Sequence, residues 1–321
     1  MTAAEAREFL EAAYASVFRR VADQGGLESY TTAMQSGMSP TDILRAFVAS
    51  AEFRDALDKR LDDYDAQLDP ALAPFRPLAN EALAEELSSG RYLNMNLFEQ
   101  LHGEACARAF EPGKEYPQDH LLLHKRRFAE LLNACCYLSR GRQRPRVLDI
   151  GNTQNLVWYK AFLPGIELVA ADRPDGPEYV DSDHRIRLDL NTGDFDRLKV
   201  VAPYDLIVFT EVLEHLSISP IVLLRQLIAL LASDGLLYLT TPNFFRLENL
   251  AKIGRRQNPL PMYPVDNTDR HHHTREYAMA ELLAVITEAG GRIRCWYFSD
   301  CWDAVPLPLD QRANLVVVVG K

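Results

Sequence analysis

The sequence predicts an α/β protein with a doubly wound, mostly parallel, seven-stranded sheet that follows a smaller all-α module. Three observations support this fold class. Short apolar runs alternate with helical segments from Arg146 onward, as is typical of parallel sheets. The first 62 residues show helical spacing of apolar side chains and no strand-like run. Acidic residues follow the ends of several runs, where a doubly wound sheet binds its ligands.

Length and composition narrow the class of protein further. The 321 residues are enough for about two domains, and 47% hydrophobic with 25% charged residues is ordinary for a globular protein. A net charge of −10 argues against a nucleic-acid partner, which requires a basic surface. No uncharged apolar run reaches the ~18 residues of a membrane helix, and the N-terminus lacks the pattern of a secretory signal.

The cysteine pattern indicates reduced thiols. The count is odd, and no disulfide or zinc spacing is present. We therefore expect a cytoplasmic protein. The five cysteines are Cys106, Cys135, Cys136, Cys295 and Cys301.

Residues 1–62 are predicted to form a helical module. A turn at 23–26 separates two helices, and Ser39-Pro40 caps a third over 41–53. This stretch resembles a small module of unknown function in bacterial proteins linked to surface glycans or secreted repeats. The resemblance implies docking or homo-oligomerisation and brings no catalytic residue. It is carried by Tyr14, Val17, Arg20, Asp23, Gly26, Tyr30, Gly37, Ile43, Phe47 and Ser50-Ala51-Glu52-Phe53.

Residues 63–118 are predicted to be a linker followed by a helical segment. Prolines at 70, 74 and 77 mark the linker. Residues 78–112 have a helical pattern and form either a cover over the next domain or a bridge to it. The main domain is expected at 119–321, beginning with a helix over 119–138.

The main domain is expected to contain seven strands. Helices at 221–232 and 277–289 are the clearest of the intervening segments. No helix separates the last two strands, which predicts an antiparallel hairpin at the end of the sheet. The expected strands are 147–150, 166–171, 186–190, 204–209, 235–241, 292–298 and 315–319.

The ends of the first four strands hold the candidate ligand-binding residues. Glycine after the first strand allows a tight turn and a close approach to a ligand, and an acidic residue after the second can accept hydrogen bonds from a ribose diol. The third strand ends in a carboxylate and an apolar side chain that suit an adenine. In chain order the candidates are Asp149, Gly151, Asn152, Asp172, Asp189, Leu190, Thr210 and Glu211.

The order of these pieces resembles the class I, Rossmann-like S-adenosylmethionine-dependent methyltransferases over residues 120–321. The resemblance implies that Gly151 lies against the methionine part of the cofactor and that Asp172 binds the ribose. Asp189 and Leu190 would lie near the adenine. The matching segments are VLDIG (147–151), VAAD (169–172), YDLIVFTEVLEHL (204–216), LLASDGLLYLTTPN (230–243) and REYAMAELLAVITEAGG (275–291).

The loop after the first strand departs from the pattern of these enzymes. Thr153 and Asn155 stand where the family has its second and third glycines. Asparagine tolerates left-handed backbone angles, so the turn can be kept, with less room beside the cofactor. This departure leaves open a non-catalytic binding or scaffold protein with a degenerate methyltransferase fold. A nicotinamide enzyme is disfavoured because no GxGxxG fingerprint is present.

A second pattern indicates a metal site. Glu211, Glu214 and His215 have the i, i+3, i+4 spacing that shares one face if a helix begins there, and carboxylates with an imidazole suit Mg²⁺ or Mn²⁺. With a later histidine, this arrangement resembles small-RNA 2′-O-methyltransferases and ubiquinone-pathway O-methyltransferases. That resemblance implies His273 as the further ligand, with His272 or His271 as substitutes.

The residues also fit two readings without a metal. His215 and His273 can act as catalytic bases, since the unperturbed pKa of histidine is ~6.5. Alternatively, EVLEHL (211–216) lines the cofactor pocket or packs in the core, and the three histidines lie on a solvated loop.

The acceptor is predicted from the segment 244–270, which follows the fifth strand and contains Arg246, Lys252, Arg255 and Arg256. A long loop at this edge often shapes a substrate site, and its basic residues suit a phosphate or carboxylate. We expect O-methylation of a sugar or glycan-precursor hydroxyl. A quinone or another small phenolic hydroxyl is the alternative.

Overall fold

The computed structural model describes residues 2–18, 20–55, 80–108, 118–151, 156–174, 182–260, 272–300, 307 and 309–321. The chain divides into two compact units, Met1–Pro74 and Phe75–Lys321. Among the described helices, none is long and apolar enough to cross a membrane.

The first unit contains three helices, α1 (Ala3–Val17), α2 (Gln24–Gln35) and α3 (Pro40–Ala49). Each begins at a side-chain cap: Thr2 closes a capping box with Glu5, Asp23 accepts from the backbone of Gly26, and Ser39 precedes a proline at the first helical position. The second and third helices therefore begin within a few residues of the starts predicted after the 23–26 turn and at Ser39-Pro40.

An aromatic cluster forms the core of this unit. Phe47 is 1% exposed and contacts the rings of Tyr14, Phe18 and Tyr30 at centroid distances of 4.7 to 5.1 Å. Arg20 lies over the Tyr14 ring. Such ring pairs stabilise beyond the area that they bury, which explains how so small a unit keeps a core of its own.

Replacing Phe47 with alanine is expected to unfold this unit selectively. Large-to-small changes of a buried phenylalanine cost about 3–5 kcal/mol, which is comparable to the whole stability of a module this small. Hydrogen exchange should show lost protection in α1–α3 and unchanged protection in the sheet. Val48→Ala, at a 38% exposed neighbour, is the control. Retained protection in Phe47→Ala would contradict this account of the core.

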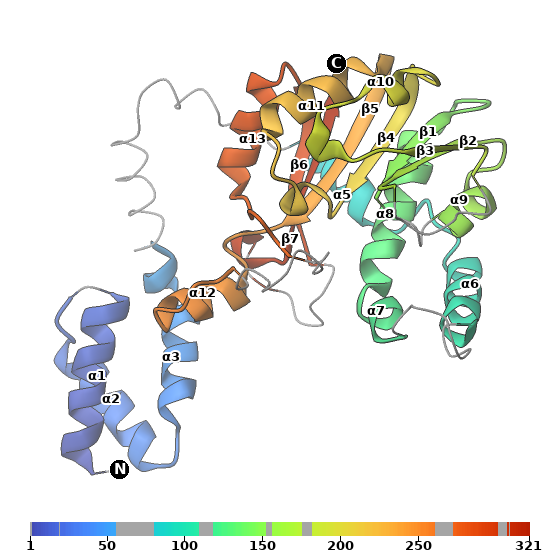
Figure 1. Ribbon diagram of the computed structural model, residues 1–321. Helices are drawn as coiled ribbons and strands as arrows, with labels where there is room; N and C mark the ends of the chain where they lie inside the picture. Colours follow the sequence, from blue (N-terminus) through green and yellow to red (C-terminus); the bar gives the residue numbers. More distant parts are fainter. Residues whose placement is uncertain are drawn as a thin grey trace. The chain divides into compact units, whose positions relative to one another are not determined.

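The second unit is built on a seven-stranded sheet with the order β3-β2-β1-β4-β5-β7-β6 (Figure 1). The pairs from β3 through β5 are parallel, and β7 is antiparallel to both β5 and β6. The prediction of a mostly parallel, doubly wound sheet is confirmed, including the antiparallel final pair. The strands are β1 (Arg146–Ile150), β2 (Glu167–Asp172), β3 (His184–Arg187), β4 (Tyr204–Thr210), β5 (Leu231–Pro242), β6 (Arg292–Ser299) and β7 (Asn314–Gly320).

Helices cover both faces of this sheet (Figure 1). On one face the core includes Leu223 of α11 and Leu283 of α13, and on the other it includes Phe128 of α8 and Trp158 of α9. Strand residues alternate between the two cores, as Leu148 and Val147 do in β1. The helices are α5 (Glu81–Ser88), α6 (Met95–Arg108), α7 (Gln118–Leu123), α8 (Lys125–Leu138), α9 (Leu156–Phe162), α10 (Asp196–Lys199), α11 (Pro220–Ala229), α12 (Leu247–Gly254) and α13 (Met279–Glu288).

Three local expectations differ from the structure. The helix expected over 119–138 is divided at His124 into α7 and α8, and the third strand, expected over 186–190, covers 184–187, so that Asp189 and Leu190 lie after it. The segment expected as a long loop over 244–270 contains α12. This helix has no side-chain cap at Arg246, so the usual start signal is missing from the sequence.

The helical segment before the main domain belongs to the second unit. α5 packs on α8 and β6, and the Asn133 amide of α8 donates to the backbone carbonyls of Glu86 and Leu87. The sequence left open whether this segment covers the sheet domain or forms a bridge to it, and these contacts are those of a cover.

Candidate active site at the carboxyl ends of the strands

The turn after β1 brings a carboxylate and a glycine together. Gly151 has a φ of +76°, and a Cβ there would lie 2.6 Å from a methyl group of Val212, so only glycine fits. Asp149 is 2% exposed, and neither of its carboxylate oxygens has a partner among the described residues. Burial, with a contribution from the nearby charge of Asp172, raises the pKa of Asp149 well above its usual range.

Two further carboxylates follow β2 and β3. Asp172 ends β2, and its Oδ1 accepts a hydrogen bond from the backbone N–H of Arg173 at 2.7 Å. Asp189 precedes the 3₁₀ turn η2 (Leu190–Thr192) and accepts from the N–H of Asn191 at 2.9 Å. Leu190 is buried in the core beside this turn, with 6% exposure. The structure thus places Asp149 and Asp172 in the last residues of β1 and β2, and Asp189 two residues after β3.

Glu211 lies at the end of β4 but turns away from the residues that follow it. It has a φ of +55°, an uncommon angle for a residue other than glycine. Its carboxylate accepts from the Thr240 hydroxyl at 2.7 Å and the Asn314 amide at 2.8 Å. Arg127 of α8 forms an ion pair with it at 3.2 Å, with both side chains less than 15% exposed. Thr210, the last residue of β4, is buried on the same side as Arg127.

The helical face expected to join Glu211, Glu214 and His215 does not form. Leu213–His215 is a 3₁₀ turn, η3, that begins only after the left-handed residue. The i, i+3, i+4 geometry of an α-helix is therefore absent, and Glu211 is directed to Arg127 instead. This corrects the expectation from the sequence that the three side chains share one face.

Glu214 is the buried acid of the site. Its side chain is 1% exposed, and its Oε2 accepts from the Thr241 hydroxyl at 3.0 Å. Burial raises the pKa of Glu214 well above its usual range, and the charge of Glu211 adds to this effect. Its backbone carbonyl accepts from the N–H groups of Thr274 and Arg275, which fixes the His272–Glu276 segment beside η3.

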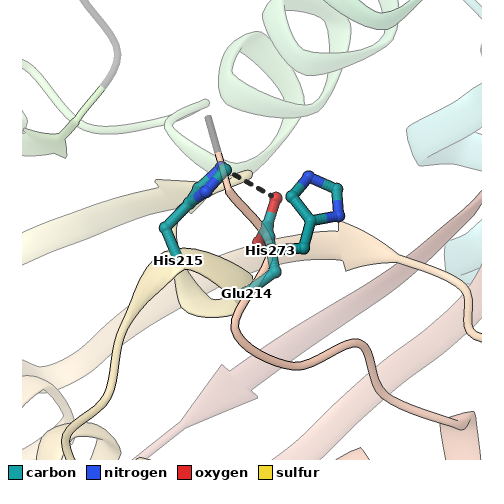
Figure 2. Close-up of side chains that lie close together, drawn as sticks. All are labelled: Glu214, His215 and His273. Carbon is teal, nitrogen blue, oxygen red and sulfur yellow. Dashed lines mark ion pairs between the residues drawn. The ribbon is translucent and has the colours of Figure 1, made fainter. Parts of the chain in front are cut away.

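Two histidines converge on Glu214 from different parts of the chain (Figure 2). The Nε2 of His215 lies 3.7 Å from Glu214 Oε1, and the rings of His215 and His273 are 4.9 Å apart in an edge-on arrangement. One potential ligand atom from each of the three residues lies within 4.8 Å of the others. The structure thus brings together three of the four metal ligands predicted from the sequence.

Both histidines have Nδ1 in a hydrogen bond with a group outside the cluster of Glu214, His215 and His273. His215 Nδ1 donates to the backbone carbonyl of His272 at 2.9 Å, because a carbonyl can only accept. His273 Nδ1 lies 2.7 Å from Oε1 of Glu276. His272 contributes its backbone to the site, and the alternative ligand His271 lies outside the described residues, as do Asn152, Thr153 and Asn155.

Glu276 is a functional candidate that the sequence interpretation missed. Its side chain is fully buried, and it accepts hydrogen bonds from His273, Arg246 and Asn249. Burial alone would raise the pKa of Glu276, but hydrogen bonds from His273 and Arg246 outweigh it and lower the pKa to about 2. The signal in the sequence was the i, i+3 spacing of His273 and Glu276 just before a helix.

Arg246 has a different role from the one expected. The sequence suggested that it meets an anionic substrate, yet its guanidinium is bound to Glu276. Lys252 pairs with Glu248 at 2.6 Å. In the described part of this segment, Arg255 and Arg256 are the exposed basic residues that remain for a phosphate or carboxylate.

The electrostatic character of this edge favours a cation. Five acidic residues lie at or just after the carboxyl ends of β1 to β4, and the charges of neighbouring pairs disfavour each other's ionisation, as with Asp149 and Asp172 or Glu214 and Glu211. A positively charged ligand or ion offsets that repulsion. The five are Asp149, Asp172, Asp189, Glu211 and Glu214.

Sheet order, antiparallel β7 and the acidic edge together define a Rossmann-like methyltransferase. Residues 122–287 match the sequence family described as a methyltransferase domain. The match spans just over half of the chain, which therefore belongs to this family of methyltransferases, and the enzyme class predicted from the sequence is confirmed. Residues 2–57 match a family described as a domain of unknown function.

Solved structures with similarity to this chain include three methyltransferases. A TehB-like S-adenosylmethionine-dependent methyltransferase from Corynebacterium glutamicum is 17% identical, with a TM-score of 0.40, over 71% of this chain and 100% of its own. An S-adenosylmethionine-dependent methyltransferase from Archaeoglobus fulgidus is 16% identical, with a TM-score of 0.41, over 71% and 100%. A Burkholderia thailandensis 1,6-didemethyltoxoflavin-N1-methyltransferase is 16% identical, with a TM-score of 0.41, over 68% and 86%. No curated protein matches the chain.

Proposed function

We propose that this protein transfers a methyl group from S-adenosylmethionine to a hydroxyl group of a sugar or glycan precursor. The observation that carries this proposal is the convergence of His215 and His273 on buried Glu214 beside the end of β4. Hydroxyl groups are poor nucleophiles until they lose a proton, and two imidazoles with Nε2 directed to one point can accept it.

The strand ends fit the cofactor. The Gly151 turn packs against Val212 at the end of β1, and the oxygens of Asp149, which have no partner among the described residues, suit an ammonium group. Asp172, the last residue of β2, would accept from the two hydroxyls of a ribose. Asp189 and Leu190 lie at the next strand end, on the side expected for an adenine. When bound, the cofactor supplies an electrophilic methyl group on a sulfonium.

The residues of the protein then accept the proton that the acceptor hydroxyl loses. As the new O–C bond forms and the C–S bond breaks, the hydroxyl proton passes to Nε2 of His215 or His273. The imidazolium that results would favour the ionised form of Glu214, whose Oε1 lies 3.7 Å from His215 Nε2, and the two opposite charges would stabilise each other. Nδ1 of each ring stays in its hydrogen bond throughout, which keeps both rings in place.

Glu214, His215 and His273 also fit a divalent metal ion. Two imidazoles and one carboxylate are a frequent donor set for such ions, and each histidine has the outer hydrogen bond that metal-binding histidines require. A metal bound here would lower the pKa of the acceptor hydroxyl.

We expect Mn²⁺ to bind this site more tightly than Mg²⁺, on the order of tenfold, because Mg²⁺ prefers all-oxygen ligands. Titration calorimetry of metal-free protein measures both affinities. Glu214→Gln should abolish binding, whereas Glu211→Gln should leave it unchanged, since Glu211 is bound to Arg127. Full activity in EDTA, with no heat of binding for either ion, would assign His215 and His273 as metal-free bases.

The choice of a glycan acceptor rests on two features. The N-terminal unit resembles modules of glycan-related bacterial proteins, and Arg255 and Arg256 present an exposed basic pair after α12 that suits a phosphorylated sugar carrier. Four described cysteines are free thiols, in keeping with a reducing, cytoplasmic compartment. Screening nucleotide-sugars, glycan fragments and phenols with methyl-labelled cofactor tests the acceptor. Methylation of phenols alone would overturn the glycan assignment.

A further inference from the structure

Glu276 collects hydrogen bonds from two segments that lie far apart in the chain. From the α12 side, Arg246 donates at 2.9 Å to Oε1 and Asn249 donates at 2.7 Å to Oε2. From its own segment, His273 Nδ1 lies 2.7 Å from Oε1. The carboxylate is fully buried, so both oxygens are satisfied by protein donors and solvent does not compete for them.

Backbone contacts hold Glu276 where these donors meet. The next residue, Tyr277, forms a parallel bridge with Asn243 at the end of β5, and its carbonyl accepts from Phe244 at 2.9 Å. The amide of Asn249 also donates to the Phe244 carbonyl. The end of β5, the start of α12 and the His272–Glu276 segment are thus joined around one carboxylate.

The hydrogen bond to Glu276 fixes both the orientation of the His273 ring and its tautomer. An ionised carboxylate accepts only, so Nδ1 of His273 must carry the hydrogen and Nε2 faces Glu214 and His215. His215 has a weaker restraint, a neutral carbonyl on His272. The two imidazoles therefore differ in the partner of Nδ1, which is a carboxylate for His273 and a backbone carbonyl for His215.

We propose that Glu276, anchored by Arg246 and Asn249, is the positioning residue that holds His273 as its Nδ1–H tautomer with Nε2 directed into the site. This inference deepens the proposed function and rests on it for the importance of Nε2. The placement of the proton by Glu276 can be tested whether or not the protein methylates a hydroxyl.

The plainer interpretation is that Glu276 only balances the buried charge of Arg246. The two interpretations differ in what His273 does when the carboxylate changes. A structural ion pair predicts that Glu276→Gln lowers stability and leaves the His273 tautomer unchanged. A positioning role predicts that the tautomer changes, because a glutamine amide offers both a donor and an acceptor to Nδ1.

The test uses two-bond ¹H–¹⁵N correlations of the full-length protein labelled at histidine, with the His273 signals assigned from His273→Asn. Wild-type protein should show His273 as the Nδ1–H tautomer, and Glu276→Gln should show a mixture or the Nε2–H form. In titrations with Mn²⁺ alone, Glu276→Gln should bind about 10- to 100-fold more weakly, the usual effect of removing an outer partner. The matched control is Glu281→Gln. Glu281 lies on α13, and its carboxylate pairs with Arg275.

Two further variants keep the test decisive. Arg246→Met leaves the contact between Glu276 and His273 in place, so its His273 tautomer should match the wild type. If Glu276→Gln does not fold, Glu276→Asp keeps the charge but withdraws it from Nδ1, and a tautomer mixture is again expected. An unchanged tautomer in the folded Glu276 variant would overturn the positioning role. Absence of Mn²⁺ binding in wild type, with the tautomer change present, would instead count against the metal.

Discussion

Asparagine in place of His215 is expected to lower kcat for methyl transfer by about 10²- to 10⁴-fold, the usual contribution of a positioned acid–base group. The variant keeps a polar side chain near the His272 carbonyl but has no nitrogen that can accept a proton beside Glu214. Affinity for S-adenosylmethionine should stay within about twofold, since the change leaves the strand ends that hold the cofactor in place.

The measurement pairs steady-state kinetics with calorimetry, using the best acceptor from the screen. His184→Asn is the control, because His184 is an exposed histidine on β3 whose partner is Glu167. A loss of kcat with unchanged cofactor affinity supports a chemical role for His215. A variant as active as wild type would remove His215 from the reaction, and an equal loss in His184→Asn would show that the effect is not specific to the site.

Alanine in place of Asp172 is expected to weaken cofactor binding by about 10- to 100-fold. A hydrogen bond to a charged group contributes about 1.5–3 kcal/mol, and Asp172 lies at the end of β2 where the ribose is expected. The stabilisation by cofactor should fall accordingly. A ligand at 100 times its dissociation constant adds ~2.7 kcal/mol of stability, and at the same concentration the variant should lose about half of that shift if binding is 10-fold weaker and most of it if binding is 100-fold weaker.

Thermal unfolding with and without S-adenosylmethionine measures this effect directly. Asp234→Ala is the control, because Asp234 pairs with Arg142 at the opposite edge of the sheet, where Arg142 also binds Asp205 at the start of β4. If wild-type protein gains no stability at millimolar cofactor, the scaffold alternative replaces the enzyme. Unchanged binding by Asp172→Ala would assign the ribose to another residue.

The apolar pattern of the strands was enough to predict the sheet. β1, β4 and β7 consist almost entirely of buried residues, and such runs have few alternatives to a central strand. α12 was missed because its eight residues follow a strand without a capping side chain. The position of Asp172 at the end of a strand could also be predicted, because the strand ends where its run of apolar residues ends.

The local sequence pattern could not predict which side chains gather around Glu214. Spacing alone did not distinguish Glu211, Glu214 and His215, but Glu211 itself adopts a left-handed backbone conformation that interrupts the helical spacing. Arg127, from a helix that precedes the sheet, then binds the carboxylate of Glu211. Glu276 was overlooked because its importance comes from Arg246 and Asn249, which lie on another segment.

The sequence by itself determined the fold class, the succession of strands along the chain and the acidic residues near their carboxyl ends, because these features depend on local patterns of apolar and charged residues. Only the tertiary structure decided which acid faces the histidines and which ring nitrogen each histidine presents. Those choices depend on partners brought together by folding, and a buried carboxylate adopts whichever orientation satisfies its oxygens.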